Sequence, residues 1–184
     1  MTGIVVAVVV VVLGLWAVLT YNRLVRRRNE VQEAWAGIDV QLQRRADLVP
    51  NLVETVKGYA SHEQGVFEEV TRARAGLMNA GGPAEAGVAD NLLQQALGKL
   101  FAVAEAYPDL KASDNFQSLQ SELSGLEEEI SFARRYYNAL VEKLNTAIQT
   151  FPNVLIAGPL GFKPAEFFKA GEAARTVPSV DFGS

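Results

Sequence analysis

The sequence contains no cysteine and a single histidine, His62. The absence of cysteine excludes disulfide bonds, thiolate catalysis and thiolate metal sites. One histidine is too few for an ordinary zinc site, and the zinc-protease pattern fails because Val66 stands where the second histidine would be needed. A serine triad would have His62 as its sole base, and no glycine-rich elbow surrounds a serine. We therefore expect no metal, no cofactor and no enzymatic activity.

The chain also lacks a large excess of charge of one sign. Its formal net charge is -4, and no long run of like charges dominates the distal part of the chain. An acidic balance repels phosphate, so no nucleic-acid partner is expected. Carboxylate chemistry is the remaining catalytic alternative, with Glu127, Glu128 and Glu129 as the densest cluster. Consecutive helical residues point in different directions, so these three cannot converge on one substrate. Glu127 and Glu129 are expected to flank an apolar seam as solvated or ion-paired side chains.

A run of uncharged apolar residues occupies 4–19, and Thr20 and Tyr21 extend it. Eighteen helical residues rise about 27 Å, near the short end of what crosses a bilayer. A cleaved signal peptide is the alternative, but no basic residue precedes the run and no convincing small-residue cleavage site follows it. The sequence therefore predicts a transmembrane anchor over residues 1–20.

Four arginines follow the apolar run: Arg23, Arg26, Arg27 and Arg28. Basic flanks are retained on the cytoplasmic side of a membrane. We therefore expect a single-pass protein of the cell membrane, with the N-terminus outside and the body in the cytoplasm. The same arginines can attract anionic lipid headgroups, at about 1 kcal/mol per basic residue near the surface. The topogenic and lipid-binding roles are compatible.

The longest periodic stretch lies over 116–151, where apolar residues recur in alternating steps of three and four. Positions three and four apart share one face of an α-helix, so the stretch predicts a long amphipathic helix. Such a seam needs equally long partner helices to cover it. It consists of Phe116, Leu119, Leu123, Leu126, Ile130, Ala133, Tyr137, Leu140, Leu144, Ala147 and Phe151.

Helical spacing also runs through 21–42 and 49–77, and Asp47 and Pro50 lie between these stretches. The two residues have two interpretations: an aspartate cap that starts a new helix, or a proline kink within one continuous helix. We favour the break, because helices of roughly 25, 32, 20 and 36 residues can then stack up and down with short turns. The kinked rod remains the alternative.

The predicted fold class is all-α, with an N-terminal transmembrane helix over 1–20 and an antiparallel four-helix bundle of long helices over 21–152. Prolines and glycines make 153–184 an irregular C-terminal segment, with one short helix expected over 165–175. Three aromatic residues of this segment are expected to pack on the bundle: Phe162, Phe167 and Phe168.

Arg45 is unusual because it falls on the apolar phase of the first body helix. A buried arginine needs a carboxylate partner or a route to solvent, and a turn at Asp47 would provide that route. Arg45, Glu127 and Glu129 are therefore candidates either for structural polar contacts or for binding a partner. Helical spacing also predicts core positions for Trp35, Tyr59 and Tyr137, but not for Tyr136.

Five glycines stand inside predicted helices, where each costs up to about 1 kcal/mol relative to alanine. Close approach of a neighbouring helix is the usual compensation, either within the bundle or from another copy of the chain. The five are Gly37, Gly58, Gly65, Gly76 and Gly125.

Two long blocks carry a family resemblance. The first occupies 21–63 and begins YNRLVRRRNEVQEAWAGIDV directly after the apolar run, and the second occupies 107–152 and includes NFQSLQSELSGLEEEISFARRYYNALVEKLNTAIQTFP. With these blocks the chain resembles the LemA family of membrane-anchored proteins over nearly all of 21–168. The resemblance implies one anchor carrying a small helical bundle, and it implies no catalytic residue, since the family has no agreed activity. The chain departs from the usual family pattern at Glu127–Glu128 and at Leu144–Asn145.

Members of that family resemble scaffolding or accessory proteins at membranes. We therefore expect a bacterial, membrane-anchored scaffold or adaptor that self-associates and has the lipid bilayer as a partner. The alternative is an accessory or regulatory subunit of a membrane protease. A carboxylate-based metalloenzyme is a third hypothesis, and the lone histidine argues against it.

Overall fold

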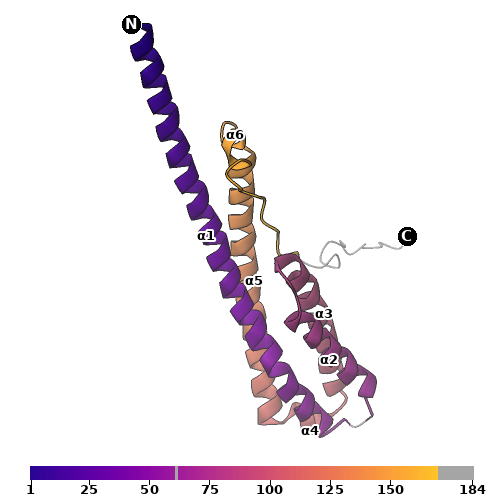
Figure 1. Cartoon of the computed structure of the whole chain (residues 1–184). Helices are drawn as coiled ribbons and strands as arrows, with labels where there is room; N and C mark the ends of the chain where they lie inside the picture. The colour runs from indigo at the N-terminus through magenta and orange to yellow at the C-terminus, as the bar shows by residue number, and fades with distance from the viewer. Residues whose placement is uncertain (61, 170–184) are drawn as a thin grey trace, which may run out of the picture. The chain divides into compact units, whose positions relative to one another are not determined.

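The structure is a computed structural model that describes residues 1–60 and 62–169, and this part of the chain is helical without a strand. The all-α prediction is therefore confirmed for these residues, while the arrangement as a four-helix bundle remains a prediction. Figure 1 shows the helices in chain order: α1 (Thr2–Lys57), α2 (Gln64–Met78), α3 (Pro83–Ala104), α4 (Pro108–Lys111), α5 (Asp114–Gln149) and α6 (Val154–Ala157).

The chain divides into two compact units. Unit 1 consists of Met1–Gly37 and Ala133–Phe167, so it holds the first part of α1, the second part of α5 and α6. Unit 2 consists of Ile38–Phe132 and the described residues from Phe168 onward. It holds the rest of α1, all of α2, α3 and α4, and the first part of α5.

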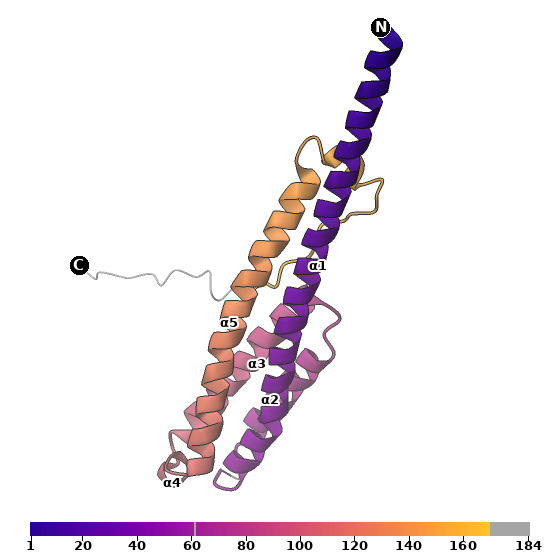
Figure 2. The same ribbon diagram turned by 90° about the vertical axis from the view of Figure 1, so that its left-hand side faces the viewer.

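In unit 1, the α1 and α5 segments run antiparallel, because residues further along α1 contact residues that come earlier in α5. The Arg27 guanidinium donates to the Lys143 carbonyl oxygen at 2.6 Å, and the rings of Trp35 and Tyr137 lie 5.9 Å apart. Leu24 and Val31 of α1 are buried, as are six residues of the α5 segment. Figure 2 shows the loop after α5 returning beside α1. The six buried α5 residues are Tyr137, Leu140, Val141, Leu144, Ala147 and Ile148.

In unit 2, four helical segments are joined by polar contacts at their edges. The Thr55 hydroxyl of α1 accepts from the Asn115 amide of α5 at 3.1 Å, and Lys99 of α3 pairs with Glu69 of α2 at 2.6 Å. α2 and α3 lie side by side (Figures 1 and 2). The interior of unit 2 is apolar, and it includes Leu42, Leu52, Val56, Val70, Leu93, Leu100 and Ile130.

The seam predicted over 116–151 is confirmed as the buried stripe of α5. All of its residues from Phe116 to Ala147 are buried except Ala133, which is half-buried. The last predicted seam residue, Phe151, is 74% exposed because it lies beyond the end of the helix at Gln149.

The break predicted at Asp47 is wrong, because α1 continues through Pro50 to Lys57. A proline lacks the N–H that would bond the carbonyl four residues earlier, which here is the carbonyl of Ala46. Ala46 is fully buried, and the Arg74 guanidinium of α2 donates to its carbonyl oxygen at 2.7 Å. The side chain of a neighbouring helix thus replaces the missing backbone donor. Asp47 caps no helix, and its carboxylate accepts from the Gln43 amide at 3.0 Å.

We predict that Arg74→Ala lowers the free energy of unfolding by about 1–3 kcal/mol, because it leaves the buried Ala46 carbonyl without a donor. In a Pro50→Ala background, the restored N–H of residue 50 can donate to that carbonyl, so Arg74→Ala is expected to cost less. Denaturant unfolding of the four chains of this double-mutant cycle measures the coupling. If Arg74→Ala lowered the free energy of unfolding equally in both backgrounds, Arg74 would not be replacing the N–H that Pro50 lacks.

The lengths of the first two helices also differ from the prediction, since α1 and α2 have 56 and 15 residues. The 22 residues of α3 and the 36 residues of α5 agree with the predicted lengths. The connection between α1 and α2 follows Lys57, so His62 lies in a loop rather than within a helix. Tyr59 lies in the same connection and is 47% exposed, which corrects its predicted core position. Residues 165–169 are not helical, and the rest of the short helix expected over 165–175 lies outside the described residues.

The close approach expected at the helix glycines is not found within the described part of the chain, since no neighbouring atom lies within 4 Å of a Cβ built on Gly37, Gly65, Gly76 or Gly125, and Gly58 meets only carbonyls of its own helix's last turns. Approach by another copy of the chain stays a prediction. Gly87 of α3 is the glycine that meets a neighbour. A Cβ there would lie 2.6 Å from the Lys169 carbonyl oxygen and 2.8 Å from the Lys169 nitrogen. Backbone of the C-terminal segment therefore lies directly on α3. Phe162 and Phe168 are buried as predicted, whereas Phe167 is exposed.

Gly87→Ala is expected to force residues 168–169 away from α3 and to expose Phe168, which is 1% exposed in the structure. Losing the burial of one such side chain costs about 1.5–3 kcal/mol of unfolding free energy. Gly98→Ala is the matched control in the same helix, because a Cβ at Gly98 meets nothing within 4 Å. The control should gain up to about 1 kcal/mol from helix propensity. Thermal unfolding that shows equal stabilisation in both variants would contradict this contact.

Candidate functional site

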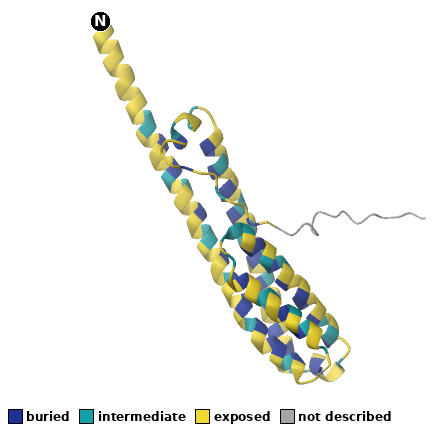
Figure 3. Cartoon of the chain, turned by 45° about the vertical axis from the view of Figure 1, so that its right-hand side comes forward, coloured by how far each residue is buried: buried dark blue, intermediate teal, exposed yellow. Residues whose placement is uncertain are grey.

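The apolar N-terminal end of α1 is an exposed, contiguous hydrophobic surface. The large side chains from Ile4 to Leu15 are all exposed, and the corresponding ribbon is uniformly yellow in Figure 3. Among residues 1–60 and 62–169, α1 is the one helix long and apolar enough to cross a membrane by length and composition. Exposed contiguous apolar surface of this size indicates an interaction with protein or membrane.

The four arginines after this stretch do not share one environment in unit 1. Arg23 and Arg26 are exposed on α1. Arg27 is tied to the backbone of α5 through Lys143, and the guanidinium of Arg28 lies 5.4 Å from the ring centre of Phe162. Arg23 and Arg26 are therefore the most accessible of the four to lipid headgroups, while Arg27 and Arg28 also stabilise unit 1.

Arg45 is a buried cation of unit 2, and two helices supply its partners. One guanidinium nitrogen pairs with the Asp90 carboxylate of α3 at 2.7 Å, and the other pairs with the Glu127 carboxylate of α5. The Arg45 and Asp90 side chains are 4% and 5% exposed, and that of Glu127 is 37% exposed. Glu127 also accepts from the Gln94 amide at 2.6 Å. Arg45 therefore does not extend to solvent, and this network links α1, α3 and α5.

A cavity of about 330 Å³ lies beside this network. Arg45 and Glu127 form its polar end, while Leu97, Phe101 and Leu123 provide apolar walls. The Arg45 Nε is buried and has no hydrogen-bond partner among the described residues. The cavity therefore combines a charged end with apolar walls.

The third predicted polar candidate, Glu129, is exposed on α5 and stands apart from the Arg45 network. Within residues 1–60 and 62–169, no group of three or more histidine or acidic side chains is placed to hold a metal ion. The Glu127 to Glu129 run therefore separates into one ion-paired residue and two exposed ones, as the helical geometry predicts.

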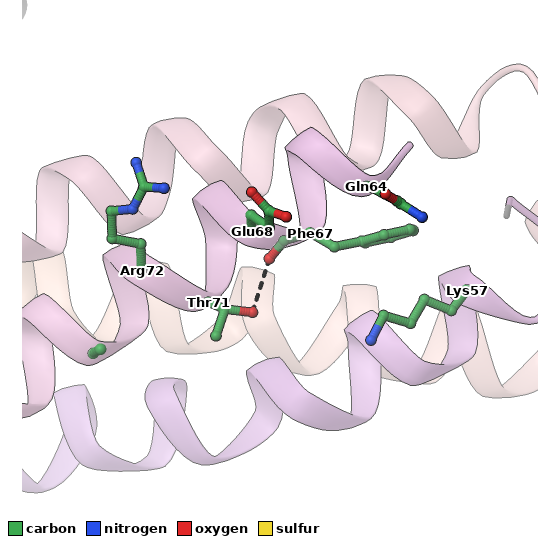
Figure 4. A pocket seen from close by; sticks show the side chains of 7 residues that line it. Lys57, Gln64, Phe67, Glu68, Thr71 and Arg72 are labelled. Atoms are coloured by element: carbon green, nitrogen blue, oxygen red, sulfur yellow. Dashed lines mark hydrogen bonds between the residues drawn. The ribbon is translucent and has the colours of Figure 1, made fainter. Parts of the chain in front are cut away.

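A second, more open cavity of about 600 Å³ lies between the end of α1 and α2 (Figure 4). The Lys57 ammonium lies 5.7 Å from the ring centre of Phe67, and the Thr71 hydroxyl donates to the Phe67 carbonyl oxygen at 2.8 Å. Glu68 and Arg72 complete a charged rim. These groups point in different directions and do not converge on a point where a substrate atom could react.

The surroundings of three ionisable groups move their pKa values away from neutrality. They are Glu63, Tyr107 and Tyr137. The Tyr107 hydroxyl donates to the Glu63 carboxylate at 2.6 Å, which lowers the pKa of Glu63 and raises the pKa of Tyr107. Burial raises the pKa of Tyr137 to about 12, and its hydroxyl donates to the Glu166 carbonyl oxygen at 2.7 Å. Both hydrogen bonds join segments that are far apart in the sequence.

Asp90 and Arg74 are the important residues that sequence reasoning missed. Asp90 had a visible signal, because it precedes Leu93 and Leu97 on the buried face of α3 at steps of three and four. A polar residue on the apolar phase of one helix is a candidate partner for Arg45 on the apolar phase of another. Arg74 carried no such signal, since its link to the Ala46 carbonyl depends on how α2 packs.

These features define a class: a helical protein whose apolar N-terminal helix fits membrane association. Comparison with known families narrows the class, because the LemA family model matches residues 34–182. The chain belongs to the LemA family, as its sequence blocks indicated.

Curated relatives match most of the chain. Protein LemA of Metamycoplasma hominis is 30% identical over 158 residues, covering 84% of this chain and 71% of the relative. The magnetosome protein MamQ of Magnetospirillum gryphiswaldense is 26% identical over 191 residues, covering 88% of this chain and 70% of the relative. Magnetosome protein MamQ 2 of Paramagnetospirillum magneticum is 28% identical over 184 residues, covering 86% and 68%.

Proposed function

We propose that this protein is a non-enzymatic, single-pass membrane scaffold or adaptor whose helical body lies on the cytoplasmic side. The observation that carries the proposal is the exposed apolar stretch from Ile4 to Leu15, which continues without a break into helix packed against α5 in unit 1. Arg23 and Arg26 follow the stretch as exposed cations, which favours retention of that flank in the cytoplasm. The position of the LemA family model, beginning at residue 34, supports a separate role for the N-terminal stretch.

The proposed mechanism is display at a surface. Anchoring confines the body to a thin layer beside the membrane, which raises its local concentration for any partner in the same membrane. A weak contact then becomes effective without a large interface. This mechanism needs an exposed recognition surface and no catalytic group.

The recognition surface we favour is centred on two aromatic residues of α5. Phe132 and Tyr136 are four residues apart on the helix and are 67% and 56% exposed. Aromatic side chains are enriched at protein interfaces, where they contribute a large share of binding energy. We propose that a second copy of the chain covers this surface, which makes the scaffold a homo-oligomer.

The mass of the full chain in mild detergent, with the detergent mass subtracted, tests this proposal. We expect a discrete oligomer that Phe132→Ala combined with Tyr136→Ala converts to a monomer without loss of helix content. Val40→Ala is the matched control, because Val40 is also an exposed apolar residue, on α1, and its loss should leave the oligomer intact. A monomeric wild-type chain would contradict self-association and favour an adaptor that needs a different membrane protein, such as a protease.

A further inference from the structure

The segment from Phe151 to Phe162, which we term the apolar loop, contains no charged residue over its whole length. It includes the short helix α6 and follows the end of α5. Four of its large apolar side chains are exposed rather than packed. They are Phe151, Val154, Leu155 and Leu160.

The apolar loop is held next to the point where the apolar stretch of α1 ends. Within unit 1, the Phe162 ring lies 5.8 Å from the ring of Tyr21, and Phe162 itself is buried. Thr20 is also buried and Trp16 is half-buried, whereas the residues from Ile4 to Leu15 are exposed. One face of the final turn of the apolar stretch is therefore covered by protein at the level where the loop lies, while Val18 and Leu19 stay exposed.

Hydrogen bonds fix the start of the loop and the chain just after it. Just before α6 begins, the Asn153 side-chain amide donates to the Ala147 carbonyl oxygen at 3.1 Å. After the loop, the Asn145 side chain accepts from the Ala165 N–H at 2.8 Å and donates to the Ala165 carbonyl oxygen at 2.9 Å. These contacts hold the loop against the end of α5, with its apolar side chains directed outward into the surroundings.

Exposed apolar side chains in an uncharged loop are costly in water but favourable at the boundary between lipid headgroups and acyl chains. Residues at the level of Thr20 and Tyr21 lie at that boundary if residues 4–19 cross the membrane. Cations that suit the headgroup level lie nearby in the sequence of both segments, at Arg23 and Lys163.

We propose that the apolar loop is a second membrane contact, which inserts Phe151, Val154, Leu155 and Leu160 into the interface of the bilayer that α1 crosses. This inference rests on the proposed anchoring by α1. The loop would orient unit 1 against the membrane surface, because a single helix leaves the protein free to rotate about the helix axis, whereas a second contact removes that freedom.

The test uses the absence of cysteine, which allows one environment-sensitive dye per chain. Full-length Leu155→Cys, Val12→Cys and Val40→Cys are each labelled with the dye and reconstituted into phosphatidylcholine–phosphatidylglycerol vesicles. Lipids carrying a quenching spin label near the headgroup or near the chain end report the depth of the dye. At position 155 we expect blue-shifted emission and a loss of fluorescence several-fold larger than at position 40. The headgroup-proximal label should quench position 155 more strongly than the deep label, since interfacial side chains reach about 5–10 Å below the headgroups.

The dye at position 12 separates failure of the loop from failure of the anchor. Quenching at position 12 by the deep label, with position 155 as unquenched as position 40, would overturn the loop contact and leave the anchor intact. Blue-shifted emission at 155 without lipid quenching would also overturn it, because protein would then cover the loop. No quenching at position 12 would overturn the anchor and the loop together.

Discussion

Replacing Arg45 by alanine is expected to lower the free energy of unfolding by about 3–5 kcal/mol, because removal of one partner leaves buried charge without compensation. Asp90 is the residue affected most, since its side chain is 5% exposed and loses its guanidinium partner. Glu127 is more exposed and keeps the Gln94 amide as a donor, so it tolerates the loss better.

Urea unfolding of the full-length protein in mild detergent, followed by circular dichroism, measures this effect. Arg44→Ala is the matched control, because Arg44 is exposed and contacts the Gln41 side chain at 3.4 Å. Changes at such surface positions usually stay within about 0.5 kcal/mol. Arg45→Met combined with Asp90→Leu should recover much of the lost stability, since an apolar pair removes the buried charges together. A cost for Arg45→Ala as small as the control would contradict the buried network.

Two charges in the apolar stretch are expected to abolish membrane association. Val9→Asp and Val12→Arg lie three residues apart near the middle of the stretch, where both side chains are exposed. Each charge at the centre of a membrane helix costs about 2.5–3.5 kcal/mol on insertion scales, so the pair costs roughly 5–7 kcal/mol. The opposite signs leave the net charge of the chain unchanged.

The measurement is the fraction of protein that stays in the membrane pellet after an alkaline wash. The wild-type chain is expected in the pellet and the double variant in the supernatant or in aggregates. A variant with Val40→Asp and Arg44→Ala alters exposed body positions and should remain in the pellet with the wild type. Retention of the Val9→Asp, Val12→Arg variant in the pellet would show that another part of the chain supplies the attachment.

The α5 helix could be predicted from sequence because its seam repeats without a gap, and that pattern depends on helix geometry alone. The path of α1 through Pro50 could not, because the local signals of Asp47 and Pro50 favour a new helix start. The donor that makes the continuous helix acceptable is Arg74, which lies on another helix. A hydrogen bond from another helix can override the local preference for a helix break, and no pattern in the sequence predicts it.

Arg45 illustrates how far a candidate site can be predicted. Its place on an apolar phase showed that it needed a partner, but the incorrect turn at Asp47 suggested a route to solvent. The continuous α1 closes that route and buries the guanidinium between Asp90 and Glu127. The surface that compensates the helix glycines could not be predicted either, since the sequence shows the cost of a glycine but not which surface lies opposite it. Of the glycines in long helices, Gly87 alone meets neighbouring backbone among the described residues.

The sidedness of two single-cysteine variants tests the membrane-anchored arrangement most directly, because the native chain has no cysteine to interfere. Thr2→Cys precedes the apolar stretch, and Val40→Cys lies at an exposed position of the body. With a membrane-impermeant maleimide, position 2 is expected to react in intact cells and position 40 only after lysis. Reaction of position 40 in intact cells, or silence of both positions until lysis, would contradict a single-pass anchor with a cytoplasmic body.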